Sequence, residues 1–277
     1  MNQPVPIPSS QSPARIGQGT AVEQSRAAAE VQAAVVVAQQ CPRNMQAAVA
    51  EMRESCKQQG LAERAFFRYS RGGQTITGAS VHLARELARV WGNVQYGLVE
   101  MRRDDEYGQS EMQAFAWDVQ TNSRNSSTFI VPHRRDTKNG PKQLTDMRDI
   151  YETNANNGAR RVREAIFAIL PPWFVEEAKD LCNQTLRDGG GKSLAQRVAD
   201  AIKAFEGIGV TRDRIEARFE RESVKWTEHD VAQLLVIYKS LQRGEVTAEE
   251  EFPAPRVSTD ELLGAAKQQA PEQSPTA

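Results

Sequence analysis

The stretch Leu144–Leu170, LTDMRDIYETNANNGARRVREAIFAIL, decides the fold class of this chain. Apolar residues recur along it at steps of three and four, as in Val162, Ile166 and Ile169. Three arginines cluster beside that apolar face: Arg160, Arg161 and Arg163. A planar guanidinium group binds two phosphate oxygens at once, which a lysine ammonium group does not. The stretch predicts an amphipathic helix that either presents arginines to an anion or pairs them with Glu152 and Glu164 on a solvated face.

The residues that precede this helix carry an excess of positive charge. Between positions 124 and 163 there are nine basic residues and four acidic ones, although the whole chain has a formal net charge of -1. A local excess of this kind is typical of a surface that binds a polyanion. Within it, His133–Lys142 contains the turn-forming sequence Asn139-Gly140-Pro141, through which a helix cannot run. We expect a basic loop that helps the arginine helix to clamp a nucleic-acid backbone without reading bases.

The predicted DNA-binding residues come from this loop, from the arginine helix and from an upstream strand. Seven cations should line one groove and contact phosphates: Arg134, Arg135, Lys138, Lys142, Arg160, Arg161 and Arg163. Tyr69, Arg71 and Trp117 are candidates for a base-stacking wall, although a tryptophan in a strand more often belongs to the core.

Composition limits the class of protein. The 277 residues can form one large domain or two small ones, and a mean hydropathy of -0.58 indicates a polar, soluble chain. The apolar run Ala33–Ala38 is too short to span a membrane, and the N-terminus lacks the pattern of a secretory signal. Cys41, Cys56 and Cys182 form no CxxC pair, which argues against a disulfide framework or a zinc site. We therefore expect a cytoplasmic protein with no membrane partner.

The chain divides into a core and a smaller module between two polar tails. The period of the apolar residues predicts an α+β core, in which an antiparallel sheet packs on helices in the order β-hairpin–α–β–β–β–α, with an N-terminal helical pair before it. A small helical bundle should follow. The predicted boundaries are a disordered tail at 1–19, the DNA-binding core at 20–186, a linker at 187–192, the helical C-terminal module at 193–252 and a disordered tail at 253–277.

The individual elements follow from turn and cap signals. In the core we expect helices over Thr20–Gln40, which a capping box should start, and over Pro42–Gly60, a hairpin over Phe66–Thr77, a helix over Ser80–Trp91, strands over Asn93–Arg103, Glu111–Gln120 and Ser127–Pro132, and then the arginine helix. In the module we expect helices over Thr211–Phe219 and Thr227–Gln242. The helices Ser80–Trp91 and Leu144–Leu170 should pack against the sheet. Its buried positions should include Ile76, Val94, Phe115, Trp117 and Phe129.

Signals of catalysis are weak. Gly191-Lys192-Ser193 matches the end of a P-loop, but Leu186 stands where the first glycine belongs and no apolar strand precedes it. No serine stands in a GxSxG turn, and no cysteine has a recognisable base. The histidines have no partners at metal-ligand spacing: His82, His133 and His229. We therefore expect no enzymatic activity and no cofactor.

The order of segments, together with Gly72–Gly78 (GGQTITG), Trp91-Gly-Asn, Ala116-Trp-Asp118 and Ala155–Arg163, resembles phage single-strand annealing recombinases of the RecT/Redβ/Erf type. The C-terminal part, Ile215–Phe252, is similar to the small helical module that often closes phage DNA-binding recombinases. The resemblance implies a DNA recombination protein that binds single-stranded DNA, forms a homo-oligomeric ring or helical filament, and promotes ATP-independent annealing in the host cytoplasm. It also makes a phage exonuclease or a host single-strand-binding protein a candidate partner.

Two alternatives remain open at this point. One is a nucleic-acid-binding or structural phage protein without a role in recombination. The other is a metal-dependent nuclease, with acidic ligands drawn from Asp104, Asp105, Glu106, Glu111 and Asp118. The alanine-rich helix also has two interpretations, because its face with Val31, Val35 and Ala38 can contact a neighbouring subunit or pack on its own sheet.

Overall fold

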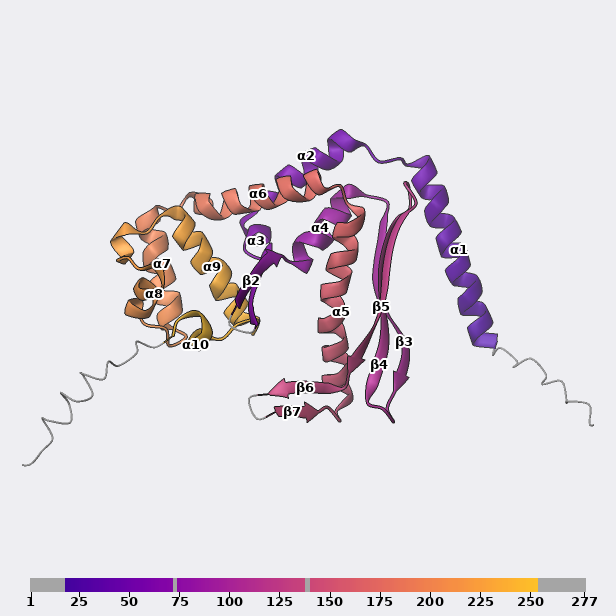
Figure 1. Cartoon of the computed structure of the whole chain (residues 1–277). Coiled ribbons are helices and arrows are strands. Elements are labelled where there is room, and N and C mark those ends of the chain that lie inside the picture. The colour runs from indigo at the N-terminus through magenta and orange to yellow at the C-terminus, as the bar shows by residue number, and fades with distance from the viewer. Residues whose placement is uncertain (1–17, 72–73, 138–139, 254–277) are drawn as a thin grey trace, which may run out of the picture.

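The computed structural model describes residues 18–71, 74–137 and 140–253, so most of the two predicted tails lies outside the described part. The fold is α+β as predicted, with antiparallel sheets packed on helices (Figure 1). The N-terminal and core elements are α1 (Gln18–Gln40), α2 (Met45–Cys56), α3 (Gln59–Ala62), β1 (Phe66–Arg71), β2 (Gln74–Ala79), α4 (Val81–Trp91), β3 (Val94–Asp104), β4 (Gln109–Asp118), β5 (Ser123–Pro132), β6 (Arg134–Thr137), β7 (Gly140–Gln143), α5 (Met147–Ile169) and α6 (Pro172–Asp188). The C-terminal elements are α7 (Leu194–Glu206), α8 (Arg212–Phe219), α9 (Glu228–Gln242) and α10 (Ala248–Glu251).

The central sheet has the antiparallel order β3-β4-β5, and α5 crosses one of its faces (Figure 1). On β4 that inner face carries small or flexible apolar residues, including Met112, Ala114 and Ala116, which are buried. Their small size allows α5 to lie close to the strands. Gly158 of α5 is a point of close approach, since an added Cβ would come within 2.1 Å of the Leu98 side chain on β3.

The predicted inward orientation of Phe115 and Trp117 is wrong. Both lie on the outer face of β4, opposite to the α5 side, and both are half-buried. Phe115 packs over Gly97 of β3, and the indole nitrogen of Trp117 donates to Asn122 Oδ1 at 3.1 Å. A bulky ring on the inner face would hold α5 away from the sheet, so the small alternating residues occupy it instead.

Three other predicted core positions differ in burial. Ile76 of β2 is 38% exposed, which corrects its assignment to the core. Val94 and Phe129 are half-buried and pack against the main core. Helix α4 packs mainly against α2 and α5 and reaches the sheet at β3.

The largest corrections to the predicted elements concern the segment after β5 and the N-terminal helices. The predicted basic loop His133–Lys142 contains a second hairpin, β6–β7, whose antiparallel register joins Thr137 to Gly140. Helix α1 begins at Gln18, before the predicted capping box. The second helix begins after the cap residue Asn44 and ends at Cys56, so Gly60 does not terminate it.

The described residues form two separate apolar cores. The main core joins α2, α4, α5, α6 and the inner face of the sheet. The second lies within the C-terminal segment and consists of Phe205, Val210, Ile215, Trp226, Leu234, Ile237 and Phe252. We refer to residues 193–252 as the C-terminal module, which packs on β1 and α6 through α9.

The glycine-rich segment between core and module is an ordered helix end. Helix α6 runs through the first residues of the predicted linker, and Gly189 caps it with a positive φ of 65°. The guanidinium of Arg197, on α7, is buried and donates to the carbonyl oxygens of Leu186 and Arg187. A side chain at position 189 would collide with this guanidinium, so both the conformation and the space require glycine.

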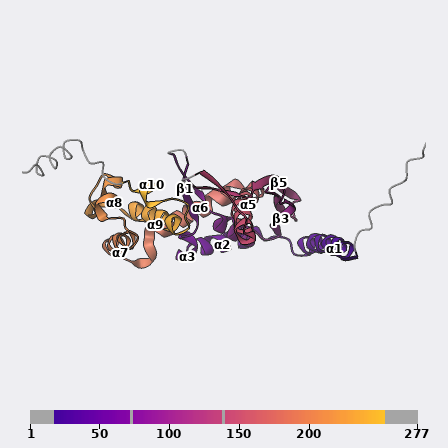
Figure 2. The same ribbon diagram turned by 90° about the horizontal axis from the view of Figure 1, so that it is seen from below.

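The elements are arranged in a flat, elongated body. Helix α1 leaves one end beside the sheet, and the C-terminal module forms the other end (Figures 1 and 2). Among the described helices, none combines the length and the apolar character that crossing a bilayer requires.

Arg43 connects the N-terminal helices to the sheet. Its guanidinium donates to the carbonyl oxygens of Trp91 (2.5 Å) and Gly92 (2.9 Å) and pairs with the Asp118 carboxylate at 2.9 Å. It also lies 4.4 Å from the centroid of the Trp91 ring. The side chains of Arg43 and Asp118 are only 4% and 3% exposed. This buried ion pair therefore holds the start of α2, the end of α4 and the end of β4 at one point.

We expect Arg43→Met to lower the free energy of unfolding by about 3–5 kcal/mol, because it leaves the Asp118 carboxylate buried without its cation. Denaturant unfolding of the full chain measures the change. Arg89→Met is the matched control, since Arg89 is 56% exposed and its surface pairs contribute at most about 1 kcal/mol. A loss from Arg43→Met no larger than that of the control would contradict the role of the buried pair.

Candidate nucleic-acid interface

A groove of about 1140 Å³ follows α5 and is lined both from the sheet side, by β5 and β6, and from the side of β1, α4 and the loop after α9. Its walls come from the outward part of α5, the last residues of β5, the start of β6, residue Phe67 of β1, the start of α4 and the loop after α9. The packing of α5 on the sheet and of α9 on β1 brings these segments together.

Six arginines line this groove. They are Arg134, Arg135, Arg160, Arg161, Arg163 and Arg243. Among the described lining residues only Glu164 and Glu245 are acidic, so the formal charge of this part of the groove is positive although that of the chain is -1. Field lines concentrate in a concave surface of one charge sign, which attracts a polyanion.

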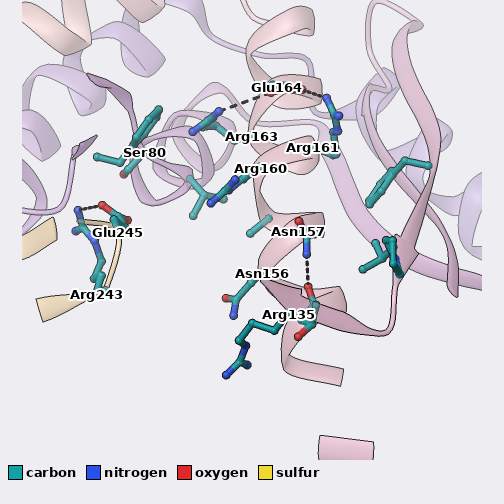
Figure 3. Close-up of a pocket in the computed structure, with 18 of the residues that line it drawn as sticks. Ser80, Arg135, Asn156, Asn157, Arg160, Arg161, Arg163, Glu164, Arg243 and Glu245 are labelled. Carbon is teal, nitrogen blue, oxygen red and sulfur yellow. Dashed lines mark hydrogen bonds and ion pairs between the residues drawn. The ribbon is translucent and has the colours of Figure 1, made fainter. Parts of the chain in front are cut away.

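The arginines of α5 are divided between the two sides of the helix. Figure 3 shows Arg160 and Arg163 on the side of Arg243, and Arg161 on the other side, with Glu164 between them. Glu164 pairs with Arg161 at 2.9 Å and with Arg163 at 3.6 Å. Arg161 lies three residues before Glu164 and Arg163 lies directly before it, so both guanidinium groups are held near one carboxylate in the groove wall. The Arg161–Glu164 pair is about half exposed, and exposed pairs of this kind are weak, so a phosphate can replace the carboxylate there.

Two aromatic rings lie beneath the guanidinium groups. Arg163 lies 4.4 Å from the centroid of Phe67, and Arg161 lies 5.9 Å from that of Phe129. Both phenylalanines line the groove. The surface therefore combines cationic groups with flat apolar faces, the combination on which unpaired bases stack.

The β6–β7 hairpin places two like charges opposite each other. Arg135 and Lys142 are direct partners in its antiparallel register, and both are exposed. Directly opposed like charges destabilise an antiparallel pair. An anion bound between them would remove this cost. Arg135 lines the groove, whereas Lys142 does not appear among its lining residues.

A buried polar network fixes the base of this hairpin to the sheet and to α5. Ser110 Oγ lies 2.8 Å from His133 Nε2 and accepts from Asn154 Nδ2 at 2.9 Å. It also donates to Glu100 Oε1 at 3.2 Å. Hydrogen bonding from Arg103 holds the pKa of Glu100 below its ordinary value, so this acceptor stays charged. The network positions the hairpin arginines relative to those of α5.

The structure brings together five of the seven predicted phosphate contacts. Lys142 lies beside the groove rather than in its wall, and Lys138 lies outside the described residues. Tyr69 and Arg71 belong to β1, but their side chains are also outside the described part. Trp117 faces away from α5 on β4 and does not line the groove.

Arg243 is the lining cation that sequence reasoning missed. It lies in the C-terminal module, beyond the local charge excess on which the prediction relied. No pattern near Arg243 distinguishes it from other surface arginines. Only the packing of α9 against β1 brings it to the groove.

The acidic residues considered for a nuclease are not assembled into one site. Asp118 accepts hydrogen bonds from Arg43, from the Trp91 indole and from the backbone N–H groups of Gln120 and Thr121. Among the described residues, no group of three or more His, Cys, Asp or Glu side chains has an arrangement that could hold a metal ion. The carboxylate of Asp118 therefore serves the fold.

We expect Ser110→Ala to lower the free energy of unfolding by about 1–3 kcal/mol, because the buried His133 and Asn154 lose their shared partner. Denaturant unfolding tests this. The exposed Ser127→Ala, on the neighbouring strand β5, should change stability by no more than about 0.5 kcal/mol. Equal values for the two variants would show that the network contributes nothing to stability.

Comparison of the chain with known protein families, characterised proteins and solved structures found no match.

Proposed function

We propose that this protein binds single-stranded DNA in the arginine groove and promotes annealing of complementary strands without ATP. The observation that carries the proposal is the groove itself. Arginines from three separate segments, β6, α5 and the loop after α9, converge on one surface in a chain with almost no net charge. Guanidinium groups bind the backbone phosphates of a strand whatever its base sequence, and annealing of arbitrary complementary strands requires this.

The aromatic part of the groove favours a single strand over a duplex. The guanidinium planes of Arg163 and Arg161 lie over the rings of Phe67 and Phe129 and can stack with the bases of an unpaired strand, whereas the bases of a duplex are already stacked on one another. The asparagines of α5 that line the groove, Asn156 and Asn157, add neutral hydrogen-bonding groups. A groove that binds the backbone and leaves base edges accessible allows a second strand to pair.

The glycine-rich segment does not have the structure of an ATP-binding P-loop. The residues before Gly189-Gly190-Gly191 form helix α6, whereas a P-loop follows a strand. The Arg197 guanidinium occupies the space beside Gly189. We accordingly propose annealing driven by binding energy alone.

We expect the double variant Arg160→Ala/Arg161→Ala to weaken binding of a fluorescent oligothymidylate. The logarithm of affinity should also depend less steeply on the logarithm of salt concentration, by about 0.7 per lost phosphate contact. Fluorescence anisotropy across a salt series measures both quantities. Annealing of complementary oligonucleotides labelled with a fluorophore and a quencher, without ATP, should slow in parallel.

The control is Arg53→Ala/Arg89→Ala, which removes two exposed arginines outside the groove. Unchanged affinity in the Arg160/Arg161 variant would exclude this groove as the binding site. Binding by the wild-type chain without annealing would favour the non-recombinational alternative, and magnesium-dependent cleavage would favour the nuclease.

Helix α1 is the part of the described chain best suited to contact another subunit. It has 23 residues, and Figures 1 and 2 show it extending away from the body. Near its end Val35 is half-buried and Ala38 is buried, whereas Val31, Val36 and Val37 are exposed. Isolated helices depend on packing for most of their stability. We propose that the adjacent exposed residues Val36 and Val37 pack against a second copy and extend the track for DNA into a ring or filament.

We expect Val36→Glu/Val37→Glu to lower the molar mass of the protein measured by light scattering, with and without single-stranded DNA. The charged side chains would be buried at the subunit contact, which is unfavourable. Val224→Glu is the control, because Val224 is 81% exposed in the C-terminal module. A wild-type protein that stays strictly monomeric in both conditions would contradict the assembly.

A further inference from the structure

The loop after α9 places an ion pair at the edge of the groove. Arg243 and Glu245 both line it, and the two side chains pair through Nε at 2.9 Å and Nη2 at 3.1 Å. Arg243 Nη2 also donates to the backbone oxygen of Phe66 at 3.0 Å. About a quarter of each side chain is exposed. The pair thus joins the C-terminal module to β1 while it remains accessible from the groove (Figure 3).

Strand β1 is shared between the groove and the module. Phe67 lies under Arg163 in the groove, and the next residue, Arg68, points to the module because successive side chains of a strand alternate. Arg68 pairs at 2.8 Å with Glu251, which is 2% exposed, and its backbone N–H donates to Ser240 Oγ at 3.1 Å. These buried polar contacts keep the module in place beside the groove.

The charge of Arg243 acts on other groove residues. Burial is the main cause that lowers the pKa of His82, a lining residue at the start of α4, below its ordinary value. Positive charges lower it further, and they come from Arg64, Arg243 and Arg85. Glu245 acts in the opposite direction. Both members of the Arg243–Glu245 pair therefore lie close enough to His82 to influence its pKa, in opposite directions.

We propose that the C-terminal module forms one wall of the DNA groove, and that Arg243 binds a phosphate there by exchanging it for the Glu245 carboxylate. This inference rests on the proposed function and adds a regulatory element to the same site. A carboxylate at the groove edge repels a polyanion and competes for the guanidinium. A phosphate accepts the same charge-assisted hydrogen bonds from the guanidinium and can therefore replace the carboxylate. Glu245 thus acts as a built-in competitor that weakens binding.

The test is Glu245→Gln in the full chain. The proposal predicts an increase in affinity for single-stranded DNA, and a purely structural role predicts none. If Glu245 competes with DNA, its neutralisation should increase affinity for oligothymidylate several-fold. If the pair only fastens the module to β1, the same change should weaken binding or leave it unaltered. Arg243→Gln should lower affinity and make the salt dependence shallower by about 0.7, the value for one phosphate contact on a single strand.

Glu206→Gln is the matched control, since it removes the same charge from an exposed position in the module outside the groove. Affinity in Glu245→Gln that is equal to or below that of Glu206→Gln would overturn the proposal. The Arg160→Ala/Arg161→Ala variant separates the two levels of inference. If that variant weakens binding but Glu245→Gln does not strengthen it, only the role of Glu245 fails. If neither variant alters binding, the groove itself is not the DNA site.

Discussion

The structure depends on the close approach of helix α5 to the inner face of the β3-β4-β5 sheet. The approach is possible because Ala114 and Ala116 leave space on β4, and because Gly158 of α5 lies against the Leu98 side chain. Packing at native density leaves no room for larger groups at such a contact. The three helix arginines take their positions from α5, and the hairpin arginines follow directly after the sheet. The close packing of α5 on the sheet therefore determines where both sets of cations lie.

The order of core elements could be predicted from sequence because apolar period and turn residues are local signals. Which face of β4 is buried could not be predicted from sequence. Large aromatic residues usually lie in the core, and no residue near Phe115 or Trp117 indicates that a helix covers the opposite face of the strand. The hairpin β6–β7 was predicted as a loop for a related reason. Its strands are short and charged and carry no apolar alternation, although Asn139-Gly140 is a hairpin turn signal.

The predictable part of the candidate site is the part that is contiguous in sequence. Arg134, Arg135 and the α5 arginines stood out through local charge excess, and the structure places them on one groove. Arg243 reaches the same groove only through tertiary packing, so no local pattern reveals it. Asp118 was instead a candidate metal ligand from its position among other acidic residues in the sequence. In the structure its oxygens accept hydrogen bonds from Arg43 and from the adjacent turn.

The ordered glycine segment after α6 has a mechanical consequence. Arg197 ties the first turns of α7 to the last carbonyl oxygens of α6, and Thr185 of α6 donates to the Cys56 carbonyl oxygen of α2 at 2.8 Å. A pull on the C-terminal end of the chain is therefore carried through the module into α6 and on to the N-terminal helices. The chain changes direction at these glycines, and the Arg197 hydrogen bonds connect the two helices across the turn. If the groove binds DNA as proposed, a strand drawn across it would load the whole body rather than a single segment.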